Sequence, residues 1–226
     1  MRLLVKPERR ANRGLRVLAR FFLIAGLLAA AGAAVARAGF FSTERRSIER
    51  MSMGILSGFA SNDFGAAIEV CAEGERGRGL IEQEEARVFR GTPPTRNGSE
   101  ADRVALLQAV RHMLTQSGAA WTDVRPVAFG GVRARVEDTT AMSRPLTVLT
   151  GGIFFESADR VFAIELSAWR CNGDYVVVDV WKAIEIPSGR AGIQAEADRI
   201  YRAFQQESDD QAGLKITYPK AVFVEF

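Results

Sequence analysis

The stretch VFAIELSAWR-CNGD-YVVVDVWKAI, residues 161–184, decides the fold of this chain. Two largely apolar runs, 161–170 and 175–184, flank the dipeptide Asn172-Gly173. Asn-Gly is the preferred pair in two-residue turns of type I′, whose backbone twist matches that of antiparallel strands. The sequence therefore predicts a β-hairpin that turns at Asn172-Gly173.

A two-residue turn also fixes which residues of the hairpin lie opposite each other. Cys171 pairs with Asp174, and the following pairs succeed one another along both strands. In this register Glu165 lies diagonal to Lys182, within reach of an ion pair. A three-residue turn would exchange the two faces of the hairpin.

Asp179 is the carboxylate that this register singles out. It lies opposite Leu166, between Val177 and Trp181 on its own strand. Because burial among apolar side chains removes the hydration of a carboxylate, such a residue suits the role of a general base. Two alternatives to this role remain. In the first, this part of the face contacts solvent; in the second, Asp179 pairs with a basic side chain or a backbone donor.

The same face carries side chains that are candidates to line a ligand pocket, namely Trp181, Leu166 and Phe162. Tyr175 lies on this face as well and is a candidate partner of Asp179. Aromatic residues of a hairpin more often belong to the core, which is the alternative for all of them.

Outward from the hairpin, the chain places helices before strands and a helix and strand after them. Helical spacing of apolar residues, or a capping residue such as Ser99, predicts helices over 44–59, 64–72, 99–114 and 191–207. Glycines at 74, 77 and 79 are expected to end the second helix. Strands are expected over 121–136, 144–156 and 221–226, with a break near Gly130-Gly131 and a bulge at Gly151-Gly152. This order predicts an α+β domain with helices packed on one face of a curved antiparallel sheet.

The first 38 residues differ in character from the rest. An uncharged run, 21–36, follows a basic tail and precedes Arg37, the pattern of a signal peptide or membrane anchor. Its 16 residues are fewer than the about 20 that span a bilayer, but the apolar segment can extend over 17–41. The alternative is cleavage near Ala36 or Ala38. In both cases residues 39–226 are expected to be one exported domain, with a core over 43–186 and a C-terminal helix and strand over 191–226.

The charge of the chain is concentrated in this leader. Residues 1–38 hold eight Lys/Arg and the single acid Glu8, a net charge of +7, whereas the whole chain carries +3. The exported part therefore carries −4, which argues against nucleic acid as a partner.

Cys71 and Cys171 are the two cysteines of the chain, and both follow the leader. In an oxidising compartment they are expected to form a disulfide, and the alternative is two separate buried thiols. The chain has one histidine, His112, and no Cys-x-x-Cys motif, so no metal site and no cofactor are expected.

Two segments resemble the nuclear-transport-factor-2-like superfamily, also called SnoaL-like or cystatin-like. They are S-N-D-F-G-A-A-I, residues 61–68, and the hairpin FAIELSAWRCNGDYVVVDVW, residues 162–181. The resemblance covers roughly 43–186 and implies a cone in which helices close a curved sheet around a pocket. The family includes isomerases and dehydratases, and also lipid-binding proteins and single-span inner-membrane components of type IV secretion systems. Its isomerase-like members use a pocket acid with a tyrosine, roles for which Asp179 and Tyr175 are candidates.

The function expected from the sequence is that of a non-enzymatic module of the cell envelope. The leader places it at the inner membrane with its domain on the exported, periplasmic side, where it binds a protein partner, a lipid or another ligand. If the leader is cleaved, the domain is secreted or free in the periplasm. The alternative function is a small-molecule-binding protein or isomerase-like enzyme with Asp179 as its base.

Overall fold

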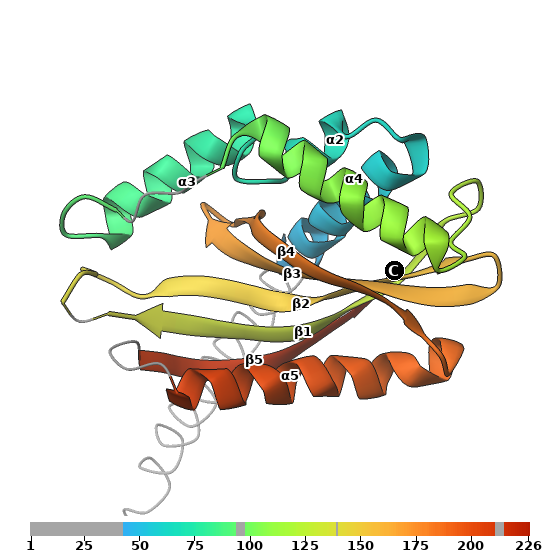
Figure 1. Cartoon of the computed structure of the whole chain (residues 1–226). Coiled ribbons are helices and arrows are strands. Elements are labelled where there is room, and N and C mark those ends of the chain that lie inside the picture. Colours follow the sequence, from blue (N-terminus) through green and yellow to red (C-terminus); the bar gives the residue numbers. More distant parts are fainter. Residues whose placement is uncertain (1–42, 94–97, 139, 211–214) are drawn as a thin grey trace, which may run out of the picture. The chain divides into compact units, whose positions relative to one another are not determined.

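Five antiparallel strands form one sheet in the order β4-β3-β2-β1-β5 (Figure 1). The structure is a computed structural model that describes residues 43–93, 98–138, 140–210 and 215–226. Residues 44–226 belong to one compact unit. The strands are β1 (Arg125–Glu137), β2 (Leu146–Ser157), β3 (Arg160–Cys171), β4 (Asp174–Ile186) and β5 (Lys215–Glu225).

The expected signal peptide or anchor, with its cleavage positions, lies outside the described residues. Among the helices within those residues, none combines the length and the apolar composition needed to cross a bilayer.

The hairpin of β3 and β4 is confirmed. Asn172 and Gly173 both have positive φ, 50° and 92°, as a type I′ turn requires, and Cys171 pairs with Asp174. Glu165 and Lys182 form an ion pair of 3.1 Å, and they lie directly opposite each other rather than diagonally.

Two register shifts in the hairpin move Asp179 away from its expected position. One lies between Ser167 and Ala168 and the other between Glu165 and Leu166. Val180 therefore lies opposite Leu166, and Asp179 lies opposite Ser167. The expected pairing of Asp179 with Leu166 is wrong, because bulges on β4 add residues that the uniform register does not count.

One face of the sheet is covered by three helices. These are the helix over residues 43–61, α2 (Gly65–Ile68) and α4 (Glu100–Gln116). Ser99 caps α4 as expected: its side chain accepts a hydrogen bond from the backbone of Asp102, whose carboxylate accepts one from the backbone of Ser99. The main core lies between these helices and the sheet and includes Ile48, Ile55, Phe59, Leu107, Leu114, Phe155 and Ile164.

The opposite face is covered by α5 (Ile193–Asp210), which follows the short 3-10 helix η1 (Gly189–Gly192) (Figure 1). Ile193, Ala197 and Ile200 of α5 form a second core cluster with sheet residues such as Phe154 and Ala163. The expectation of helices on one face alone is therefore wrong. The helix spacing in 191–207 predicts the apolar stripe of α5, but not the face of the sheet that receives it.

The paired glycines of β1 and β2 do not interrupt the sheet. Gly130 pairs with Gly152 and Gly131 with Gly151 in continuous register, so the expected break and bulge are both wrong. These glycines serve close packing instead: a Cβ on Gly130 would lie 2.6 Å from the Cβ of Ala197 on α5.

Helix α3 (Glu75–Val88) also departs from expectation. Gly77 and Gly79 lie inside it, whereas the helix expected over 64–72 is only α2, Gly65–Ile68. Helix α3 packs near the hairpin turn, where Ile81 joins Ala72, Cys171 and Val176 in a small third cluster.

Candidate functional site

The three candidates for a cone pocket do not line a common cavity. Phe162 and Leu166 are completely buried in the main core, whereas Trp181 is 46% exposed. The indole N–H of Trp181 donates to Glu165 at 3.3 Å, so this side chain lies with the Glu165–Lys182 pair. The extra residues on β4 explain the separation, because a bulge changes the face to which the following side chain points.

Aromatic side chains fill the core around Phe162. The ring of Phe162 stacks on that of Phe155 at a centroid distance of 5.6 Å, and Phe155 stacks on Trp121 at 6.0 Å. Trp121 then meets Phe59 edge to face at 5.6 Å. These contacts place Phe162 in a packed core.

Asp179 is exposed at the bulge of β4. Its carboxylate accepts a hydrogen bond of 2.8 Å from the backbone N–H of Val180. It also lies close enough to Arg103 for a favourable charge interaction. Of the alternatives left open by the sequence, contact with solvent and pairing to a donor describe this residue.

Tyr175, the candidate partner of Asp179, belongs to a different network. Its hydroxyl donates to Glu44 at 2.9 Å, and its backbone N–H donates to Ser47 at 2.8 Å. Glu44 also accepts two hydrogen bonds from Arg133, at 2.6 and 2.7 Å. Burial, and then the nearby charge of Glu44, raise the pKa of Tyr175, so its phenol stays protonated as a donor.

Cys71 and Cys171 are both buried, and no disulfide joins them. The topology explains why. Cys171 lies on β3, while the segment of Cys71 pairs with Val177 on the far side of β4. Two strand spacings, about 9.6 Å, exceed the Cα separation of about 4.4–6.8 Å that a disulfide permits. Burial raises the pKa of the Cys71 thiol to about 12, so it is a poor nucleophile as well.

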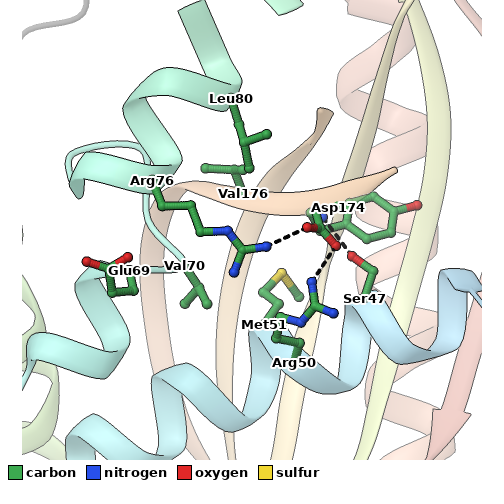
Figure 2. A pocket seen from close by; sticks show the side chains of 10 residues that line it. Ser47, Arg50, Met51, Glu69, Val70, Arg76, Leu80, Asp174 and Val176 are labelled. Atoms are coloured by element: carbon green, nitrogen blue, oxygen red, sulfur yellow. Dashed lines mark hydrogen bonds and ion pairs between the residues drawn. The ribbon is translucent and has the colours of Figure 1, made fainter. Parts of the chain in front are cut away.

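A surface depression lies beside the hairpin turn, between the helix over 43–61 and the start of α3 (Figure 2). It is shallow: the enclosed volume is about 10 Å³, room for about one water molecule, within about 260 Å³ of space that includes open solvent. Four separate segments of the chain supply its lining: Ser47, Arg50 and Met51; Glu69 and Val70; Arg76 and Leu80; and Asp174, Tyr175 and Val176.

Asp174 is the charged centre of this depression. One carboxylate oxygen accepts from Arg50 at 2.8 Å and the other from Arg76 at 2.7 Å (Figure 2). The side chains of the two arginines are 52% and 47% exposed, and that of Asp174 is 29% exposed. The acid is thus held between two cations that remain accessible to a partner.

The chemistry of the depression suits binding. Among its apolar lining residues, Val70 and Leu80 are partly exposed beside the charged groups, whereas Met51 and Val176 are buried in the core. Within the described ranges, no three His, Cys, Asp or Glu side chains are grouped so as to hold a metal ion.

The sequence offers only part of this site. Asp174 follows the Asn-Gly turn directly, so its position at the end of the hairpin can be predicted. Arg50 and Arg76 come from two helices that lie 124 and 98 residues away from Asp174 in the chain, and no local pattern brings them there.

Comparison with known proteins does not assign a family or a function to this chain. No family model, no curated protein and no solved structure matches the chain.

Proposed function

We propose that this protein is a non-enzymatic interaction module of the cell envelope, which binds a protein partner at the depression around Asp174. The observation that carries the proposal is the pair of half-exposed arginines, Arg50 and Arg76, set beside apolar side chains. Arginine is among the residues that contribute most to binding at protein interfaces.

The sequence of the leader supports a location at the inner membrane with the domain on the exported side. A basic tail followed by an apolar run is the pattern of an anchor or export signal. The α+β architecture is compatible with the nuclear-transport-factor-2-like fold, and we propose membership of that superfamily on the strength of this order of elements.

The alternative, an isomerase-like enzyme with Asp179 as its base, has less support from the geometry. That role needs a desolvated carboxylate, whereas Asp179 is exposed and lies opposite Ser167. Tyr175 is engaged by Glu44 rather than by Asp179.

Site-specific photo-crosslinking in cells that make the full chain tests the proposal. A photoreactive residue at Leu80, on the depression, should give a defined adduct with one protein. The same residue at Ala195, an exposed position on α5, should not. The Leu80 adduct should be lost when Arg50 and Arg76 are both changed to Ala, and kept when Arg125, an exposed ion-pair residue elsewhere, is changed to Ala.

Membrane fractionation of the same cells, with intact-mass analysis, tests the location. A full-length chain that resists alkaline extraction supports the anchor, and a mass matching cleavage near Ala36 or Ala38 supports a free exported protein.

In the crosslinking experiment, an adduct at Leu80 that does not depend on the two arginines would overturn the proposed binding site.

A further inference from the structure

We propose that the depression recognises a carboxylate of the partner, and that Asp174 occupies the place of this carboxylate while the protein is free. This inference rests on the proposed function and names the chemistry of the partner. It makes Asp174 an internal competitor for the two arginines that the partner needs.

The hydrogen-bonding capacity at the depression points to an acceptor on the partner. A guanidinium has five N–H donors. Within the described part of the chain, Arg50 uses one N–H group on one oxygen of Asp174, and Arg76 uses one on the other oxygen. Asp174 already accepts from both sides, whereas each arginine is about half exposed and has N–H groups beyond the one that its bond to Asp174 uses. An incoming group that supplies acceptors fits this surplus, and one that supplies donors does not.

A carboxylate matches these donors better than a neutral acceptor. It can accept two parallel hydrogen bonds from one guanidinium, which are stronger and more directional than single neutral ones. Asp174 leaves this bidentate geometry unused, because its oxygens are divided between Arg50 and Arg76.

The start of α3 adds a positive end to the same place. Arg76 lies in the first turn of this helix, and the N-cap residue Gly74 contributes no side-chain hydrogen bond. The partial positive charge at a helix N-terminus favours an anion, and Glu75 in the same first turn offsets part of it. Glu69, which is exposed, lines the same depression and disfavours a second acid at its end (Figure 2).

The apolar side chains define what surrounds that carboxylate. Val70 and Leu80 are partly exposed beside the arginines, so an acidic residue flanked by leucine or a similar residue fits. A short peptide, acetyl-Leu-Glu-Leu-amide, is therefore a suitable probe, with acetyl-Leu-Gln-Leu-amide as its uncharged match.

Titration of the full-length chain in detergent micelles tests the inference, with the side-chain N–H signals of Arg50 and Arg76 followed by NMR. The glutamate peptide should shift both signals, and the glutamine peptide should bind at least about three times more weakly. Asp174→Asn should raise the affinity for the glutamate peptide about three- to tenfold, because it removes the charge that competes for the two guanidiniums while keeping the shape of the side chain. Arg50→Ala and Arg76→Ala should each lower it. Arg190→Ala, which removes an exposed partner of Glu156, should leave it unchanged.

Two results would overturn the inference. Equal binding of the two peptides would exclude carboxylate recognition, and an unchanged affinity in Asp174→Asn would exclude exchange with Asp174. Asp174→Ala provides a second test of that exchange if the asparagine variant does not fold, as judged by its amide spectrum. Failure here while the Leu80 adduct still depends on the arginines would leave the proposed function intact. Loss of that dependence would remove the proposed function itself.

Discussion

At the scale of single residues, Glu44 shows how a buried charge can hold one helix to the sheet. Its side chain is 8% exposed and accepts from both Arg133 on β1 and Tyr175 on β4. Removing the charge leaves Arg133 without its acid in a partly buried site. We expect Glu44→Gln to lower the free energy of unfolding by about 2–4 kcal/mol and Tyr175→Phe by about 1–2 kcal/mol. Urea unfolding measures both.

Arg45→Ala is the matched control for Glu44→Gln. Arg45 neighbours Glu44 in the same helix, but its side chain is 57% accessible and makes only exposed contacts, an ion pair with Glu49 and a hydrogen bond to the backbone oxygen of Glu225. An exposed pair contributes at most about 1 kcal/mol, so this variant should be close to the parent in stability. Equal losses for Glu44→Gln and Arg45→Ala would show that the buried network does not stabilise the fold.

The same residues show where sequence reasoning ends. Glu44 is recognisable as a residue of a helix start, but its partners lie 89 and 131 residues further along the chain. Likewise, the turn predicts where Asp174 lies, while Arg50 and Arg76 reach it only through the packing of two helices. Charge partners of this kind depend on tertiary structure, which local patterns do not encode.

At the scale of elements, local sequence patterns predict the type of an element more reliably than its partners in the fold. The Asn-Gly turn and the Ser99 cap are confirmed because each involves only neighbouring residues. The position of Asp179 and the face covered by α5 are wrong in the sequence interpretation. A single bulge reverses the alternation of a strand, and an amphipathic helix can cover either face of a sheet.

Two glycines of helix α3, two residues apart, allow the packing of this helix to be tested. A Cβ on Gly77 would overlap the carbonyl oxygen of Cys71, while a Cβ on Gly79 meets nothing within 4 Å. We expect Gly77→Ala to destabilise the protein by about 1–3 kcal/mol, because backbone must move to admit the methyl group. Gly79→Ala should stabilise it by about 0.5–1 kcal/mol through helix propensity.

Thermal unfolding of the two variants separates a glycine needed for close packing from one that is merely tolerated in a helix. Since Gly77 holds the first turns of α3 against the segment of Cys71, Gly77→Ala should also weaken the Arg76–Asp174 contact. A changed chemical shift of the Arg76 side-chain N–H groups in Gly77→Ala, relative to the parent protein, would reveal this effect. A stabilising Gly77→Ala variant would contradict the packing described for α3.

At the scale of the whole molecule, Cys71 links the stability of the fold to alkaline pH. Its thiol lies in the main core, where residues 70–72 join β4, and burial raises its pKa from 9.0 to about 12. Because the folded pKa lies above the unfolded one, the protonated thiol stabilises the fold fully below pH 9, and this contribution is lost as pH rises toward 12. The free energy of unfolding should therefore fall by about 1.4 kcal/mol per pH unit in this window. Urea unfolding should show a flat stability from pH 8 to 9 and then that slope up to about pH 10, where Tyr175 begins to add to it, in the parent and in Cys171→Ala, which retains Cys71. It should be absent in Cys71→Ala until Tyr175, whose raised pKa acts with the same sign, begins to contribute. An identical slope in Cys71→Ala would mean that the Cys71 thiol is not the group whose ionisation opposes folding.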